Sequence, residues 1–195
     1  MSKKTKHLCL CCGGRRIKEC CRPKISPGAE GTTHCTKLAM RKDVESLAAA
    51  GRHLEAIEIL EKLLAGSPRN PLIWNDLGVQ YEAIGEIDKA LDALRRGHAI
   101  DPTYPPTLYN LGKFTLARFM SLEKVALGAE VEGQRILEEA ISFLNAYLDR
   151  DPDNADGHYY LALAYDLNQD EQMAAAHMTV TLRLRQALEL LQTVR

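Results

Sequence analysis

The feature that most constrains the fold of this chain is a pattern that repeats every 34 residues. Pro68 and Pro102 are 34 residues apart, and Pro152 follows after 50 more, which is 34 plus 16. Nine and ten residues after each proline stands a leucine followed by a small residue: Leu77-Gly78, Leu111-Gly112 and Leu161-Ala162. A period of this size indicates stacked copies of one supersecondary unit.

Each unit is typical of two antiparallel helices. Apolar residues recur at helical spacing, as in Ile57, Leu60 and Leu64. Ser-Pro or Asp-Pro ends the second helix, because proline lacks the N–H that continues it. The small residue after the leucine lets the partner helix approach closely. An alanine stands at the matching place in each second helix: Ala56, Ala90, Ala140 and Ala174. The pattern therefore predicts an all-α solenoid.

The segment WNDLGVQYEAIGEIDKALDALRRGHAIDP closely resembles the tetratricopeptide repeat (TPR) family. The family's pattern positions are held by Trp74, Leu77, Gly78, Tyr81, Gly85, Ala90 and Pro102. The resemblance covers residues 37–195 and implies TPR-like repeats at about 37–70, 71–104, 105–154 and 155–195. Residues 25–36 are expected to be a linker, and residues 1–24 a separate small module.

Two stretches depart from the regular repeat. The third unit carries 16 extra residues between Gly112 and Ala140. Divided over two helices, they lengthen each by about 12 Å, with Gly128 or Gly133 at the tip; a loop over 117–132 is the alternative. The second stretch, TLRLRQALELLQTVR, ends the chain and is expected to cap the last repeat.

No catalytic motif appears in the repeats, so we expect a protein that is not an enzyme. The sequence has no His-Glu-x-x-His, phosphate loop or Gly-x-Ser-x-Gly. His53, His98, His158 and His177 are scattered, and His158 occupies a packing position of its repeat.

The TPR resemblance implies a concave surface, lined by the first helix of each unit, that binds a peptide or protein partner. The candidate groove residues are Asn75, Val79, Glu82, Tyr109, Lys113, Leu116, Tyr159, Leu163 and Asp166. Only Asn75 and Lys113 suit a clamp for a C-terminal carboxylate, and Glu82 and Asp166 oppose one. We therefore expect a mixed apolar and aromatic groove.

The N-terminal segment concentrates five of the six cysteines between His7 and Cys21. The spacing Cys9-x-Cys11-x8-Cys20-Cys21 supplies four thiolates, the number that a tetrahedral zinc ion takes. Gly13-Gly14 permits the chain reversal between the two pairs. A redox pair at Cys20-Cys21 and a disulfide knot are the alternatives.

The same spacing, followed by a basic residue and proline, resembles the SEC-C zinc-binding motif of the bacterial preprotein translocase ATPase. The resemblance implies that Zn²⁺ is bound by Cys9, Cys11, Cys20 and Cys21. It also implies a basic docking rim, formed by Arg15, Arg16 and Lys18, for an acidic chaperone-like or ribosome-associated partner. Cys12 and Cys35 are left as bystanders in this interpretation, and proteins with this pairing of modules look bacterial.

Charge divides the chain into a basic arm and an acidic body. Residues 1–42 hold eleven Lys/Arg and two Asp/Glu, a net +9; residues 43–195 hold fourteen and twenty-four, a net −10. The arm offers an alternative function, nucleic-acid binding, although it has no aromatic residue for base stacking. No stretch is apolar enough to span a membrane, and no secretory signal is present, so we expect a cytoplasmic protein.

We predict that protein purified without chelator contains about one zinc ion per chain, because the cysteine spacing supplies four thiolate ligands. Cys20→Ser combined with Cys21→Ser should abolish metal binding and leave the helical circular dichroism and melting nearly intact, because the repeats have their own core. Metal analysis and thermal melting test both points. Metal-free wild-type protein would refute the site, and loss of helix in the double variant would show that this module packs into the repeats.

Overall fold

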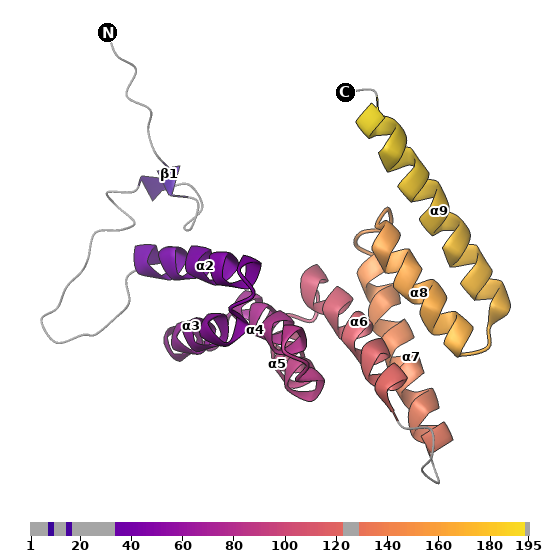
Figure 1. The fold of residues 1–195 in the computed structure, drawn as a ribbon, viewed down its shortest axis with the longest axis horizontal. Coiled ribbons are helices and arrows are strands. Elements are labelled where there is room, and N and C mark those ends of the chain that lie inside the picture. The colour runs from indigo at the N-terminus through magenta and orange to yellow at the C-terminus, as the bar shows by residue number, and fades with distance from the viewer. Residues whose placement is uncertain (1–7, 10–14, 17–33, 123–128, 194–195) are drawn as a thin grey trace, which may run out of the picture. The chain divides into compact units, whose positions relative to one another are not determined.

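The computed structural model describes residues 8–9, 15–16, 34–122 and 129–193, and the chain divides into two compact units, Met1–Pro68 and Arg69–Arg195 (Figure 1). The first unit contains β1 (Leu8–Cys9), β2 (Arg15–Arg16), α2 (His34–Ala49) and α3 (His53–Gly66). The second contains α4 (Pro71–Ala83), α5 (Ile87–Ile100), α6 (Pro105–Ser121), α7 (Ala129–Leu148), α8 (Ala155–Leu167) and α9 (Glu171–Thr193).

The first unit contains a helical hairpin and a short strand pair. The turn between α2 and α3 contains Gly51, whose φ of 72° lies in the left-handed region that glycine adopts without strain. Val44 of α2 and a row of α3 residues are buried: Ala56, Ile57, Leu60, Leu63 and Leu64. In the antiparallel pair β1–β2, Leu8 stands opposite Arg16 and Cys9 opposite Arg15.

The second unit consists of three helical hairpins, α4–α5, α6–α7 and α8–α9, and consecutive hairpins pack against one another. Asn70 and Asn154 cap α4 and α8, since their side-chain oxygens accept hydrogen bonds from the N–H of Leu72 (3.1 Å) and Gly157 (2.8 Å). Proline starts α4 and α6, where the missing N–H costs nothing. The predicted all-α architecture of paired helices is confirmed.

The small residue after the repeated leucine determines how closely the two helices of a hairpin approach. A Cβ atom on Gly112 would lie 2.5 Å from Leu144 Cγ, and one on Gly78 would lie 2.7 Å from Leu94 Cγ. Both leucines are fully buried. The close approach predicted from the sequence therefore exists, and the space that glycine leaves is filled by a leucine of the partner helix.

The 16 extra residues of the third repeat, which forms the hairpin α6–α7, partly lengthen its two helices. α6 has 17 residues where α4 and α8 have 13, and α7 has 20 where α5 has 14. The extensions, four and six residues, add about 6 and 9 Å rather than 12 Å each. Gly133 lies inside α7, so the expectation that it forms the tip was wrong; Gly128 lies outside the described residues.

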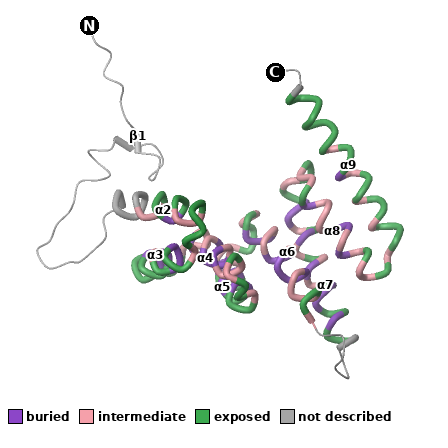
Figure 2. The backbone as a smooth tube through the Cα atoms, viewed as in Figure 1, coloured by how far each residue is buried: buried purple, intermediate pink, exposed green. Residues whose placement is uncertain are grey.

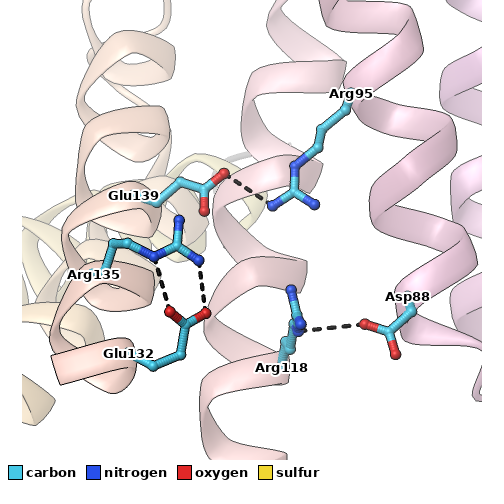
Figure 3. Close-up of polar contacts among 6 residues, drawn as sticks. All are labelled: Asp88, Arg95, Arg118, Glu132, Arg135 and Glu139. Carbon is cyan, nitrogen blue, oxygen red and sulfur yellow. Dashed lines mark hydrogen bonds and ion pairs between the residues drawn. The ribbon is translucent and has the colours of Figure 1, made fainter. Parts of the chain in front are cut away.

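Two ion pairs link the extended hairpin α6–α7 to α5, the helix before it (Figure 3). Arg118, near the end of α6, pairs with Asp88 at the start of α5 (3.3 Å), and Arg95 of α5 pairs with Glu139 of α7 (3.0 Å). Their side chains are partly exposed, so each pair contributes at most about 1 kcal/mol.

The C-terminal stretch continues the second helix of the last hairpin, so that α9 has 23 residues and is longer than α5 with 14. Its role as a cap stays a prediction. α9 is exposed over most of its length (Figure 2), and Leu182 remains 63% exposed. No helix among the described residues is long and apolar enough to cross a membrane.

We predict that Gly112→Ala destabilises the second unit by about 1–3 kcal/mol, because the new methyl group meets Leu144, and that this outweighs the helix propensity gained. Leu144→Ala alone should cost about 2–5 kcal/mol, and the double variant less than the sum of the two. Urea unfolding measures all three. Strictly additive costs would contradict the contact.

Candidate functional site

The nine predicted groove residues all lie on α4, α6 and α8, the first helices of the three hairpins of the second unit. Six of them are half-buried: Val79, Glu82, Tyr109, Lys113, Tyr159 and Leu163. Asp166 is exposed. These seven side chains are accessible from solvent in part and remain candidates for contact with a partner.

The other two predicted groove residues are buried. Leu116 is 1% exposed and packs with Leu144 and Leu161 in the core of the last two hairpins. Asn75 is 6% exposed, and its Oδ1 accepts a hydrogen bond from Asn110 Nδ2 at 3.0 Å, which links α4 to α6. Both side chains therefore hold helices together, and we remove them from the candidate site.

Four tyrosines form a continuous aromatic cluster, here called the tyrosine face: Tyr109, Tyr147, Tyr159 and Tyr160. Ring centroids lie 5.2 Å apart for Tyr109–Tyr147, 5.9 Å for Tyr109–Tyr160 and 5.4 Å for Tyr159–Tyr160. The sequence interpretation included Tyr109 and Tyr159 but missed Tyr160 and Tyr147. Tyr160 directly follows a predicted groove position, and that adjacency was the available signal.

The environment of the tyrosine face is apolar and negatively charged. Burial, reinforced by Tyr160 and the charge of Asp156, raises the pKa of Tyr109 to about 12. Burial also raises the pKa of Tyr147, whose hydroxyl donates a hydrogen bond to Asp151 Oδ2 at 2.8 Å. These two tyrosines therefore remain neutral hydrogen-bonding groups at any physiological pH.

Two cations lie over tyrosine rings at this face. Lys113 Nζ is 5.8 Å from the ring centroid of Tyr160, and the guanidinium carbon of Arg185 is 5.3 Å from that of Tyr159. Arg185 Nη2 also pairs with Asp156 Oδ1 at 3.1 Å. This arrangement favours cation–π contacts and provides no clamp for a carboxylate.

A histidine pair joins α8 to α9. Nδ1 of His158 lies 2.9 Å from Nδ1 of His177, and His158 Nε2 lies 3.0 Å from the carbonyl oxygen of Pro152. Because a carbonyl only accepts, Nε2 of His158 carries the proton, and His177 then donates to the bare Nδ1 of His158. The packing role expected for His158 thus includes a polar connection between the two helices.

Most of the predicted zinc ligands lie outside the residues that the structure describes. Cys11, Cys20 and Cys21 of the ligand set and Lys18 of the rim lie outside the described residues. Only the backbone of Cys9, Arg15 and Arg16 is described, in the β1–β2 pair. In the parts of the chain that are described, no three His, Cys, Asp or Glu side chains are arranged to hold a metal ion.

A pocket of about 450 Å³ does not coincide with the predicted groove residues. It is lined by Val131, Gln134, Arg135 and Glu138, all from one face of α7. Val131 is 77% exposed, and residues 123–128 nearby are not described. We therefore assign the candidate site to the tyrosine face and the accessible groove residues.

Stacked antiparallel helical hairpins define this protein as a helical-repeat protein. Models of the tetratricopeptide repeat match residues 47–112 and 129–188, which together exceed half of the chain. The chain belongs to the tetratricopeptide repeat family. No curated protein sequence matches it.

Several solved structures share the fold. TTC0263, a TPR protein of Thermus thermophilus, is 24% identical, with 76% of this chain and 74% of that chain covered and a TM-score of 0.64. YrrB, "a TPR protein with an unusual peptide-binding site", is 18% identical over 76% and 68%, with a TM-score of 0.60. The first TPR of Spaghetti, bound to an HSP90 peptide, is 17% identical over 67% and 90%, with a TM-score of 0.55.

We predict that the attachment of α9 weakens as the pH falls. Burial and, second, the charge of His158 lower the pKa of His177 below its usual 6.5. The unfolded chain then binds more protons than the folded one, so stability present above about pH 6.5 is lost as the pH drops toward the folded pKa. His177→Gln should flatten this dependence in urea unfolding between pH 7.5 and 5.5. His53→Gln, in the first unit, should keep it; equal slopes in all three proteins would contradict the assignment.

Proposed function

We propose that this protein is a non-enzymatic adaptor that binds a peptide or protein segment on the first-helix side of its second unit. The observation that carries the proposal is the tyrosine face on α6, α7 and α8, with the partly accessible Leu163 packed against the same cluster as Tyr109 and Tyr160. The rings of Tyr109, Tyr159 and Tyr160 are half-buried, so each keeps part of its surface open to solvent. Aromatic rings supply large contact areas with few side-chain torsions to immobilise, which favours binding of another chain.

The comparisons support this function in outline. TPR repeats typically mediate protein–protein or peptide binding, and the names of two similar structures mention a peptide-binding site and a bound HSP90 peptide. This chain offers aromatic rings where a carboxylate clamp would need several unpaired cations. We therefore propose an extended or helical segment with apolar or aromatic residues as the partner.

We further propose that residues 1–24 form a zinc-stabilised docking module of the SEC-C type, with Cys9, Cys11, Cys20 and Cys21 as Zn²⁺ ligands. The antiparallel pairing of Cys9 with Arg15 supports a chain reversal between the two cysteine pairs. Four thiolates suit zinc, and a reducing bacterial cytoplasm would keep them available. Arg15, Arg16 and Lys18 would then contact an acidic chaperone-like or ribosome-associated partner. Two tethered modules gain affinity through effective concentration.

Nucleic-acid binding by the basic arm is the second candidate function. The observation that favours it is the net charge of +9 over residues 1–42. Such binding would weaken steeply with salt, because phosphate contacts release counterions.

A pull-down from a bacterial lysate with and without nuclease separates the two candidates. We expect capture of a protein that survives nuclease treatment. Leu163→Glu, which places a charge between the groove residues, should reduce capture at least tenfold, equivalent to about 1.4 kcal/mol. Leu182→Glu, at an exposed leucine of α9, is the control for the added charge and should leave capture unchanged. Circular dichroism melting checks that Leu163→Glu, at a residue packed against the core, is still folded. Capture abolished by nuclease and indifferent to Leu163→Glu would favour the basic arm.

A further inference from the structure

One edge of the tyrosine face already holds a guanidinium group. Arg185 of α9 lies 5.3 Å from the ring centroid of Tyr159, and its Nη2 pairs with Asp156 Oδ1 at 3.1 Å. An aromatic face and a carboxylate on the same turn of α8 together satisfy both the ring-stacking and the hydrogen-bonding preferences of arginine.

We propose that Tyr159 and Asp156 form a binding site for an arginine or lysine side chain of a basic segment in a partner protein, and that Arg185 occupies this site in the absence of the partner. The proposal rests on the proposed function of this face as a peptide-binding surface, and it names the chemistry of the peptide.

The position of Arg185 follows from how α9 packs. Thr181 Oγ1 lies 3.4 Å from the carbonyl oxygen of Ala155, so α9 passes the first turn of α8 at this residue. Arg185 follows one turn later and therefore lies over Asp156 and Tyr159. The remainder of α9, including Leu188 and Leu191, is exposed. Arg185 therefore lies in the exposed C-terminal half of α9.

The contact made by Arg185 is exposed and therefore exchangeable. The side chains of Arg185 and Asp156 are 50% and 64% exposed. Exposed ion pairs contribute little to stability because water solvates both partners. A partner's guanidinium can take the same two interactions while the rest of its segment gains contacts along the face, so exchange favours the partner.

Charge at the face also favours a basic segment. Glu82 and Asp166 carry two negative charges among the groove residues and Asp156 of the proposed site adds a third, against the single positive charge of Lys113 once Arg185 is displaced. Residues 43–195 as a whole carry a net −10. Such a field attracts cationic segments and repels acidic ones. Burial is the main cause of the raised pKa of Tyr109, and the negative charge of Asp156 adds to it.

Lys113 provides a second example of the same chemistry. Its ammonium lies 5.8 Å from the Tyr160 ring and 5.4 Å from that of Phe114. Cations thus lie over the rings of two adjacent tyrosines, from two different helices. This recurrence favours a partner with a basic residue next to an aromatic or apolar one, whose cation would lie over Tyr159.

The experiment selects peptides from a random display library on the full-length protein, with Leu163→Glu as the counter-selection target. Selected peptides are synthesised with each Arg or Lys present and replaced by Gln, and their affinities are measured by calorimetry. We expect selected sequences to be basic, and the Gln version at the residue that enters the site to bind about threefold more weakly, the size of one exposed cation–π contact.

Substitutions in the proposed site should change the affinity for a basic peptide in opposite directions. Arg185→Ala should raise the affinity for a selected basic peptide about threefold. Arg185 competes with the peptide for the site, and one exposed cation–π contact is worth about that factor. Asp156→Asn and Tyr159→Leu should lower it, and Tyr159→Phe, which keeps the ring, should not. Arg183→Ala, an exposed arginine on the same helix, is the control. Circular dichroism melting checks that each variant is folded.

Each failure has a distinct meaning. Selected peptides that are acidic or uncharged, or an affinity that falls in Arg185→Ala, would overturn the cation site and leave the peptide-binding function intact. No enrichment over Leu163→Glu would overturn the proposed function itself. If a synthetic peptide of residues 1–24 outcompetes every selected peptide, the occupant of the site is the chain's own basic arm. That result would overturn the proposal of a separate partner protein.

Discussion

The structure of the second unit depends on the close approach of two helices at a glycine. At Gly112, the absence of a Cβ lets Leu144 of α7 enter the space beside α6, and Gly78 with Leu94 repeats the arrangement in α4–α5. Both leucines lose all contact with water as a result. This contact sets the spacing of the two helices in α4–α5 and in α6–α7. The tyrosine face is built on these stacked hairpins, with Tyr109 on α6, Tyr147 on α7, and Tyr159 and Tyr160 on α8.

The tyrosine face distinguishes this chain from a scaffold of the same fold with a carboxylate-binding groove. Its cations lie over aromatic rings, and Arg185 is further held by Asp156. A cation that is engaged in this way contributes little net positive potential to the surface. The proposed recognition at this face therefore suits partners that bring their own positive charge or that bind through apolar contact. In this proposal, the fold positions the face, and a few side chains on α8 and α9 determine its preference.

Sequence reasoning was most accurate where it followed the repeat and least accurate at the level of single side chains. It predicted the paired helices and the glycine contacts, because spacing along a helix determines which residues share a side. It placed Leu116 in the groove because Glu82 and Asp166 hold the same repeat position, yet Leu116 is buried in the core. An apolar side chain turns inward when the neighbouring hairpin offers space, and no periodicity reports that space. The division of residues 1–36 from the repeats stays a prediction.

The sequence by itself determined the class of fold, the number of residues in the repeat and the identity of the residues that allow close packing. These properties can be read along the chain, because helical spacing and the 34-residue period are patterns of sequence position alone. Only the tertiary structure decided that Tyr109 meets Tyr160, that Asn75 bonds to Asn110, and that α9 runs on past α8 to bring Arg185 to Asp156. Those contacts join residues of different helices, and their distances depend on how the hairpins stack. The candidate binding site of this protein is built from such contacts between helices, so the sequence alone did not determine it.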